Sequence, residues 1–454
     1  LIDGMTISFH HHLRNGDSVT NPVLDTIADM GIKNLTLAPT ALFPIHNPIL
    51  KHIENGVITN IEGSMNGPIG EACTYGKLPK VATLRTHGGR VRAIEAGELK
   101  IDVAFIAAPI ADKAGNANGR YGQSAFGPIG YQEADVRHAE KVVIITDNIQ
   151  PHPIACQRIS QVRVDYVVEV DTLGDPQQIV SLTTKVTTDP RKLIMARAVT
   201  DVLDALEIIQ PGFNFQAGAG GISLAATKYL GELLEERGIV GGFGMGGGTQ
   251  YLVDILRKGN IRLILEGQCF DLPSIVDLRE NPHDHVEITP YDYANIHSKG
   301  NFVDDLDTVF LGATEVDTKF NVNVNTHADG KLLHGIGGHT DTAAGSRCTI
   351  ITCPTFRKTN PTIVDDVITV TTPGETIDVV VSEAGIAINP KRKDLIKKAE
   401  GKGLDLKTIE ELRDIGYAGA NQKPIKPDFT DEVVALIEYR DGTIIDVVRR
   451  LKEE

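Results

Sequence analysis

The amino-acid sequence predicts an α/β protein made of two homologous halves, each a mainly parallel sheet with helices on both faces. Its 454 residues are too many for one ordinary core and fit two domains of about 200 residues each. Short β-branched runs alternate with helical stretches, which is the pattern of parallel strands joined by covering helices. The third observation is an internal repeat that spans most of the chain.

The repeat is clearest in two segments that align without a gap. "DVAFIAAPIADKAGNAN" (102–118) lies against "DTVFLGATEVDTKFNVN" (307–323). This alignment pairs Asp112 with Asp317, Asn116 with Asn321 and Asn118 with Asn323. "DGMTISF", which begins at Asp3, resembles "PGFNFQAGAGG", which begins at Pro211. Further matches follow in the same order, so chance is a poor explanation.

The individual elements follow from local pattern. Buried strands are expected at apolar, β-branched runs bounded by Gly, Pro and Asp: 102–108, 141–146, 261–267 and 377–383. An amphipathic helix is expected over 223–238, with Ser223 as N-cap and Gly238 past its end. We predict a first domain over 1–205 and a second domain with a C-terminal extension over 206–454. The extension should form peripheral helices and an edge strand at "VVALIEY" (433–439).

Composition excludes several classes of function. The net charge of −15 argues against a nucleic-acid partner, which needs a basic face. No apolar run approaches the roughly 20 residues that span a bilayer, and no signal peptide is visible. The 5 cysteines form no CxxC pair, so neither disulfides nor a structural zinc site is indicated. We therefore expect a cytoplasmic protein without metal or membrane partner. Because the chain begins at Leu1, we also expect its start to be truncated.

The second half offers glycine-rich segments where the loops at strand ends should lie. "QAGAGG" (216–221) and "GGFGMGGG" (241–248) follow apolar stretches, and the first leads into the predicted helix. Glycines let backbone N–H groups approach an anion, and a helix N-terminus adds partial positive charge. The candidate oxyanion donors are Gly218, Gly220, Gly221, Gly246 and Gly247. The alternative is that these glycines serve only tight turns.

A third glycine-rich segment is "HGIGGHTDTAAG" (334–345). His339 could be a catalytic group there, with Asp341 beside it. Alternatively, Asp341 caps the next helical turn and His339 makes a structural hydrogen bond.

The first half carries positive side chains at the matching places. "FHHHLRNG" (9–16) stands where the second half has "FQAGAGG", and "LRTHGGRVR" (84–92) reads as a second basic loop. Arginine binds carboxylates bidentately, so these segments predict a site for a small polyanion. The candidate substrate-binding residues are His10, His11, His12, Arg14, Arg85, His87 and Arg90. "LRTHGGRVR" could instead be a solvated surface turn, and "HHH" lacks the spacing of a zinc site. Glu62 and Glu266 occupy matching places in the repeat and complete the list.

These motifs resemble a known family. "DVAFIAAPIADKAGNANGR" is similar to the Ala-Asp-Arg-Ala-Gly-Asn segment of coenzyme A transferases, and "LLHGIGGHTDTAAG" is similar to a glycine loop in their second half. Together with "DGMTISFHHHLRNG" and "EVDTKFNVNVNTHADG", they resemble the α subunits of citrate lyase from Asp3 to about Arg392.

The resemblance implies two coenzyme A transferase-like domains and a citrate:acetyl-acyl-carrier transferase. The thioester would be carried on the phosphoribosyl-dephospho-coenzyme A group of a γ acyl carrier subunit, with acetyl-CoA or a CoA analogue as a further ligand. A β subunit would split the citryl thioester, and the chain would form a homo-oligomer. Citrate and acetate would be substrate and product.

One departure concerns the nucleophile. Two-step coenzyme A transferases carry a glutamate in a Ser-Glu-Asn-Gly segment where this chain has "GGFGMGG". We therefore expect direct attack by a citrate carboxylate, through a mixed anhydride. The alternatives are a glutamyl thioester, with Glu266 as the nearest substitute, the equivalent citramalate lyase subunit, or a ligand-sensing module.

Overall fold

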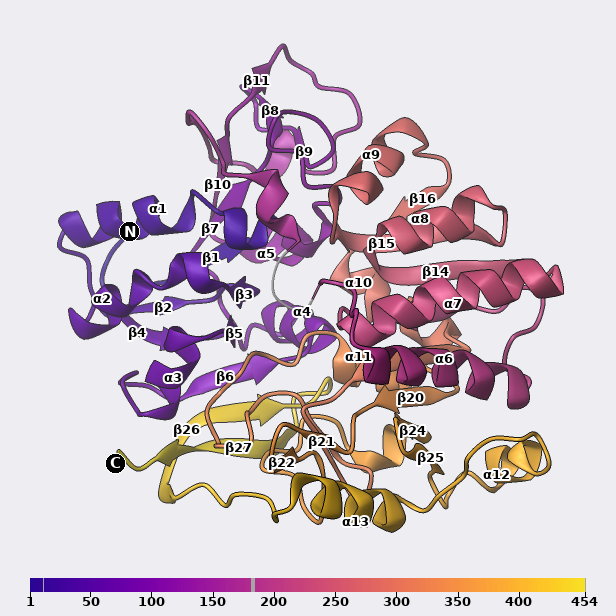
Figure 1. Ribbon diagram of the computed structural model, residues 1–454. Helices are drawn as coiled ribbons and strands as arrows, with labels where there is room; N and C mark the ends of the chain where they lie inside the picture. Colours follow the sequence, from indigo (N-terminus) through magenta and orange to yellow (C-terminus); the bar gives the residue numbers. More distant parts are fainter. Residues whose placement is uncertain (11, 181–183, 454) are drawn as a thin grey trace.

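The computed structural model describes residues 1–10, 12–180 and 184–453, in which two large sheets stand side by side (Figure 1). The first sheet has 6 strands, and every pair of neighbours is parallel. In spatial order they are β12 (Tyr166–Glu169), β10 (Lys141–Thr146), β7 (Val103–Ala107), β1 (Thr6–His10), β2 (Leu35–Leu37) and β4 (Ile58–Ile61).

The second sheet has 8 strands, and only its last pair, β24 with β25, is antiparallel. In spatial order they are β16 (His285–Glu287), β15 (Ile261–Cys269), β14 (Gly241–Gly248), β13 (Phe215–Ala217), β17 (Thr308–Gly312), β20 (Thr349–Thr352), β24 (Val379–Ser382) and β25 (Gly385–Ile388). The prediction of an α/β protein with mainly parallel sheets is confirmed.

Helices cover both faces of each sheet, because the alternating apolar side chains of a parallel strand need cover on both sides. On the first sheet, α1 (Thr20–Asp29), α2 (Ile49–Glu54) and α3 (Pro68–Thr74) pack into one core, and α4 (His87–Glu95) and α5 (Glu133–His138) into the other.

On the second sheet, one core contains side chains of α6 (Pro190–Ala205), α7 (Gly221–Arg237), α8 (Gln250–Arg257) and α12 (Lys393–Ala399). The opposite face is covered by α11 (His339–Gly345), α13 (Ile409–Ala420) and α10 (Pro290–Tyr293). Helix α9 (Leu272–Glu280) crosses to the first half, where Ile275 and Leu278 join the core of the first sheet.

The two sheets share one strand order, β12-β10-β7-β1-β2-β4 in the first and β24-β20-β17-β13-β14-β15 in the second. The hydrogen bonds also match: Thr6 N–H donates to Asp102 at 2.7 Å, and Asn214 N–H to Asp307 at 2.8 Å. Each half also has a small three-stranded sheet. In the first half it consists of β8 (Ile110–Asp112), β9 (Ala117–Asn118) and β11 (Ile149–Gln150). In the second half it consists of β18 (Glu315–Asp317), β19 (Val322–Asn323) and β23 (Ile363–Val364). In both, the carboxylate of the aligned aspartate, Asp112 or Asp317, accepts from the aligned asparagine.

The C-terminal segment returns to the first half. Strand β26 (Phe429–Glu438) lies between β27 (Ile444–Leu451) and β6 (Ala82–Arg85), at the lower left of Figure 1. The predicted edge strand is therefore wrong, because this strand is paired on both sides. Conversely, α6 precedes the predicted domain boundary but packs in the core of the second sheet.

Two other sequence predictions need correction. The run 241–248 is not a loop but the central strand β14, and "LRTHGGRVR" is not a loop but the end of β6 followed by α4. Helix α7 begins at Gly221 with Gly220 as N-cap, rather than at Ser223, whereas Gly238 ends it in the left-handed region (φ 61°) as predicted.

Short elements complete the fold: β3 (Ala41–Leu42), β5 (Ser64–Met65), β21 (Phe356–Arg357), β22 (Asn360–Pro361) and the 3-10 turns η1 (Arg14–Gly16), η2 (Pro44–His46), η3 (Gly130–Gln132), η4 (Gln161–Arg163), η5 (Pro176–Ile179), η6 (Phe302–Asp305) and η7 (Gly374–Thr376). No helix within the described part of the chain is long and apolar enough to cross a membrane.

Candidate functional site

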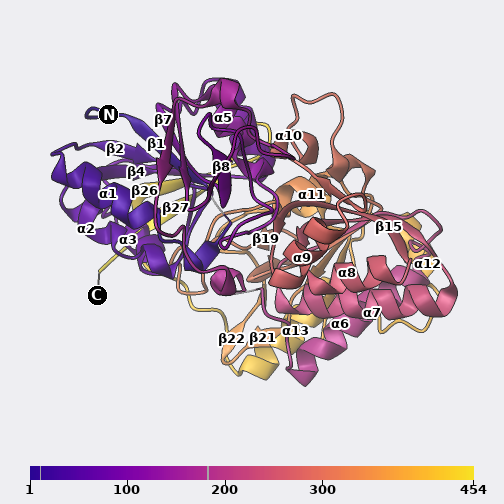
Figure 2. The same ribbon diagram turned by 90° about the horizontal axis from the view of Figure 1, so that it is seen from above.

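The two halves meet at a buried aromatic and polar cluster, which we call the histidine–tyrosine cluster: His10, His12, His87, Tyr131 and Tyr293. The ring of Tyr131 lies 4.6 Å from that of His87, 5.8 Å from His10 and 5.9 Å from His12, between ring centres. His87 also approaches Tyr293, with 6.3 Å between ring centres. Seen from above, α5, α10 and α11 lie between the two sheets in this region (Figure 2). The cluster therefore draws residues from both halves.

The strand of the second half that corresponds to β1 also reaches this cluster. Gln216, in β13, donates to the hydroxyl of Tyr293 at 3.0 Å. Its amide oxygen and the hydroxyl of Tyr131 are buried and have no hydrogen-bond partner within the described residues. Buried polar atoms are nearly always satisfied, so these two atoms mark a place for a water or a ligand group.

His87 and Tyr131 are uncharged within the cluster. Burial, with the charges of His10 and Arg90, lowers the pKa of His87 to about 3, so its ring is uncharged at pH 7. Burial raises the pKa of Tyr131 well above its ordinary value, so the phenol keeps its proton. Tyr131 was missed in the sequence. Tyr131 lies two residues before α5, and Gly337 lies two residues before α11. The two residues therefore occupy matching places in the repeat, which is the sequence signal that could have indicated Tyr131.

Arg90 and His10 are joined to a buried carboxylate. The Arg90 guanidinium donates to both oxygens of Asp135 at 2.8 Å and to the carbonyl of Ala38 at 3.0 Å. The ring of His10 lies 2.7 Å from the hydroxyl of Thr40 through Nδ1, and 3.4 Å from Asp135 through Nε2. Burial opposes the ionisation of Asp135, but the charges of Arg90 and His10 outweigh it and hold its pKa below the usual range. The charge of Arg90 is thus already matched inside the protein.

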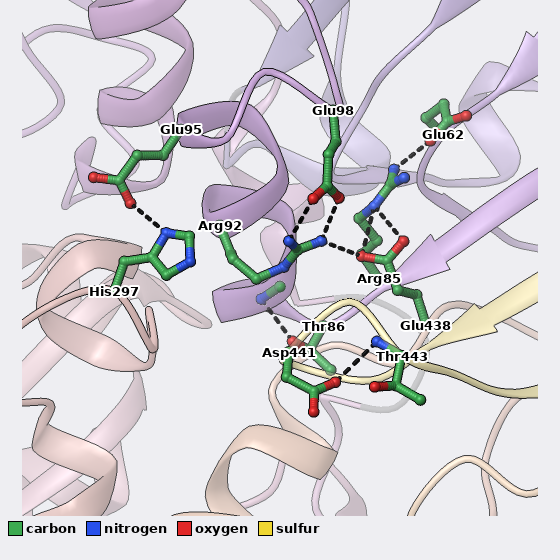
Figure 3. A network of polar contacts seen from close by, with 11 residues as sticks. Glu62, Arg85, Thr86, Arg92, Glu95, Glu98, His297, Glu438, Asp441 and Thr443 are labelled. Carbon is green, nitrogen blue, oxygen red and sulfur yellow. Dashed lines mark hydrogen bonds and ion pairs between the residues drawn. The ribbon is translucent and has the colours of Figure 1, made fainter.

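Arg85 and Glu62 form a second internal network, which includes the C-terminal hairpin (Figure 3). Arg85 pairs with Glu62 and donates through Nε to both oxygens of Glu438 at 3.0 Å. Glu438 also accepts from Arg92 at 3.0 Å, and Arg92 binds Glu98 at 2.6 and 2.8 Å. The basic segment is therefore neither an open polyanion loop nor a solvated turn.

Arg14 has different surroundings. Its guanidinium lies between the rings of Phe43, at 4.8 Å, and Phe270, at 5.3 Å, the latter from the second half. Burial lowers its pKa to about 10, so it stays charged at pH 7. It lines a small cavity of about 10 Å³ together with Phe9, Thr20, Pro39, Thr40, Ala41, Leu42, Phe43 and His46. A guanidinium stacked on its faces still presents its edge, which is the geometry for a carboxylate.

The candidate glycines differ in what their backbone can do. The N–H of Gly218 donates to the carbonyl of Phe310 at 2.9 Å, so it is not available to an oxyanion. Gly220 and Gly221 form the N-terminus of α7, and the N-cap Gly220 has no side chain to cap the helix. The first amides of a helix have no partner within it and favour negative charge.

The pairing of β14 with β15 shifts register between Gly246 and Gly247, where Gly267 of β15 is the extra residue, and Gly246 has φ 120°. A Cβ on Gly247 would lie 2.1 Å from the ring of Phe270, and one on Gly248 would lie 2.0 Å from Oε2 of Glu266. Packing therefore explains glycine at these two positions.

Glu266 and His339 are held by structural contacts. Glu266 is fully buried, lies 2.7 Å from Nδ1 of His285, and has its pKa raised by burial. Because a carbonyl only accepts, Nε2 of His339 donates to Gly312 O at 3.1 Å and Nδ1 accepts from Thr372 at 2.7 Å. Burial lowers the pKa of His339 to about 4.

Asp341 links the halves, because its carboxylate accepts from the N–H of Gly88, at the start of α4, at 3.0 Å. It thus caps a helix of the other half rather than its own. His11 lies outside the described residues. Within them, no group of three or more His, Cys, Asp or Glu side chains could hold a metal ion.

Similarity to known proteins agrees with this picture. The family model "Citrate lyase, alpha subunit" matches residues 1–451. The citrate lyase alpha chains of Haemophilus influenzae and Escherichia coli are each 44% identical over 454 residues, covering 100% of this chain and 90% and 89% of theirs. A crystal structure described as the α subunit of citrate lyase from Streptococcus mutans in complex with citrate has TM-score 0.97 and 45% identity, over 100% of this chain and 89% of that one.

More distant structures share the fold alone. The malonate decarboxylase α subunit of Acinetobacter baumannii has TM-score 0.67 at 15% identity, over 93% of this chain and 88% of its own. By the full-length family match and the identities above, the chain belongs to the citrate lyase α-subunit family, the transferase subunits of that enzyme.

Proposed function

We propose that this chain exchanges the acetyl group of an acyl-carrier thioester for citrate, giving the citryl thioester and acetate. The full-length match to citrate lyase α chains carries the proposal, and the citrate-bound relative from Streptococcus mutans supports citrate as substrate. The partners would be a γ acyl carrier subunit, with its phosphoribosyl-dephospho-coenzyme A group, and a β subunit that cleaves the product. We infer a cytoplasmic homo-oligomer whose halves are copies of one coenzyme A transferase-like unit, as their common strand order suggests.

The chemistry proposed is direct attack by a citrate carboxylate on the acetyl carbonyl. A carboxylate is ionised at pH 7 and needs no base. The C–S bond breaks and the thiolate leaves, so that a citric–acetic anhydride remains. The thiolate then attacks the citryl carbonyl, the C–O bond breaks, and acetate leaves with one oxygen that came from citrate.

Three groups at the boundary of the two halves would assist this reaction. Arg14, at the boundary of the two halves, would bind a citrate carboxylate. The amides of Gly220 and Gly221, at the uncapped start of α7, would stabilise negative charge on the tetrahedral oxygen. The unpartnered hydroxyl of Tyr131 fits a carbonyl oxygen of the thioester group. The reactive end of the prosthetic group would fit between the Tyr131 hydroxyl and the first amides of α7.

The competing route is a glutamyl thioester, as in two-step coenzyme A transferases. Its nearest nucleophile, Glu266, is fully buried and hydrogen-bonded to His285, which disfavours attack on a bulky thioester. The equivalent citramalate lyase subunit is the other alternative, and a comparison of kcat/KM for citrate and citramalate distinguishes the two substrates.

A single turnover with carboxylate-¹⁸O citrate and excess enzyme tests the mechanism. Direct attack places one ¹⁸O in the released acetate and leaves the protein unlabelled. A glutamyl route gives unlabelled acetate in the first turnover and ¹⁸O in the protein. Glu266→Gln serves as the matched variant: its acetate should carry the same label as the wild type's, and an unlabelled acetate would overturn direct attack.

A further inference from the structure

A second cavity, of about 440 Å³, has a lining that shares no residue with the histidine–tyrosine cluster. Its walls come from the loop after α10, from η6 and α11, and from the turn between β26 and β27. The polar and charged residues that line it are Ser298, Lys299, Asn301, Asp304, Tyr439, Arg440 and Asp441. The second half and the C-terminal hairpin thus build this cavity together.

Arg440 is the unusual member of this lining. Its side chain is only 9% exposed, yet its one hydrogen bond is a long one, 3.4 Å from Nη2 to the carbonyl of Ala294. Its Nε is buried without a partner, and no carboxylate pairs with it in the part of the chain that the structure describes. A buried charge without a hydrogen-bonded counter-ion is costly, so such groups are normally paired.

The other buried arginines also have an unpartnered Nε, but unlike Arg440 they are paired with carboxylates. Arg90 binds both oxygens of Asp135, and Arg92 binds both oxygens of Glu98 and one of Glu438. Asp341 is the acid whose charge acts on Arg440, but its carboxylate is hydrogen-bonded to Gly88 instead. The guanidinium of Arg440 therefore keeps donors for an anion in the cavity.

The rest of the lining narrows the class of anion. Lys299, at the exposed rim, adds a second positive charge, while Asp304 and Asp441 add two negative charges. The lining therefore suits one anionic group, placed between Arg440 and Lys299, better than the three separate carboxylates of citrate. The two carboxylates can accept from hydroxyl groups, and Ile296 and the ring of Tyr439 offer apolar surface.

We propose that this cavity is a binding site for a phosphorylated, hydroxyl-bearing ligand, a sugar phosphate, whose phosphate is held by Arg440 and Lys299. The phosphate replaces the missing counter-ion of Arg440, and the sugar hydroxyls donate to Asp304 and Asp441. The site does not depend on the transfer mechanism, because it shares no residue with the proposed catalytic groups.

Calorimetric titration of the full chain with ribose 5-phosphate, inorganic phosphate and ribose tests the site. We expect ribose 5-phosphate to bind at least tenfold more tightly than inorganic phosphate, and ribose not to bind. Equal affinity for the two phosphates would overturn the role of the carboxylates. Absence of binding by any phosphate at tens of millimolar would overturn the site.

Two variants test the residues. Arg440→Met, which fills the same space without charge, should lose at least tenfold in affinity for ribose 5-phosphate and keep the melting temperature. Lys299→Glu changes an exposed residue, leaves folding intact, and should lose several-fold. Lys319→Glu, an exposed lysine paired with Asp366, is the matched control and should bind as the wild type does.

Wild-type affinity in both Arg440→Met and Lys299→Glu would refute the proposal. The acetyl-exchange rate, measured alongside, should be unchanged in all three variants without added sugar phosphate.

Discussion

The strand ends of the two halves face one another with opposite chemistry. In the first half they carry charged side chains, and most of those charges are matched by buried carboxylates of the same protein. In the second half they carry glycines, some fixed by packing and some at the uncapped start of α7. The difference shows that a basic motif and a glycine-rich motif can each be mainly structural. Arg14, which lies over aromatic rings of both halves, and the first amides of α7 are then the best candidates for chemistry.

The largest effect should come from breaking the buried pair between Arg90 and Asp135. Arg90→Met leaves the carboxylate of Asp135 buried without its bidentate partner, which should cost about 3–5 kcal/mol of unfolding free energy. Chemical denaturation measures the loss. The double variant Arg90→Met/Asp135→Asn should recover most of it. A stable single variant with a raised KM for citrate would instead make Arg90 a substrate ligand.

The packing role of the second-half glycines can be tested at two positions. Gly247→Ala places a Cβ 2.1 Å from the ring of Phe270 and should cost about 1–3 kcal/mol. Gly220→Ala meets no atom within 4 Å, so thermal melting should show a much smaller change. Equal destabilisation of both variants would remove the distinction between packed and open glycines.

Arg14 should behave as the converse of Arg90. Arg14→Gln removes the charge but keeps a polar group between Phe43 and Phe270, so the unfolding free energy should change by less than about 1 kcal/mol. Loss of a charged hydrogen bond to a carboxylate, about 1.5–3 kcal/mol, should raise KM for citrate roughly tenfold or more. Steady-state kinetics with varied citrate decide the matter, and an unchanged KM would exclude Arg14 from citrate binding.

The last prediction concerns the contact between halves at Asp341. Burial raises the pKa of Asp341 from its ordinary 3.8 to about 6 in the folded protein. The group therefore contributes stability below pH 3.8, and this contribution is lost as the pH rises towards 6. Asp341→Asn cannot titrate, so only the wild type should lose this stability as the pH rises. The melting temperature of the variant minus that of the wild type should therefore rise between pH 4 and pH 6 and then stay level. A constant difference across this range would show that Asp341 is already ionised at pH 4.

Much of the fold could be predicted because it rests on local pattern. Alternating β-branched runs predict parallel strands, and the aligned Asp112 and Asp317 make the same hydrogen bonds in the two halves. The glycine run 241–248 was misread because glycine is a poor strand former, and only its packing against Phe270 and Glu266 explains it.

The candidate site was harder to predict, because its contacts join distant parts of the chain. Arg85 meets Glu438 across 353 positions, and Arg90 meets Asp135 across 45. Local sequence shows the positive charge of each arginine but not the carboxylate that neutralises it. No short motif surrounds Tyr131, and only its place before α5 in the internal repeat marks it.

The strand pairing of β26 with β6 has a consequence for how the molecule is made. On the ribosome, the first half emerges long before residues 429–451, yet it needs them to cover β6 and to neutralise Arg85 and Arg92. Until then β6 exposes an unpaired edge, which is a template for wrong association. The first half can therefore reach its final structure only after the second half has been synthesised.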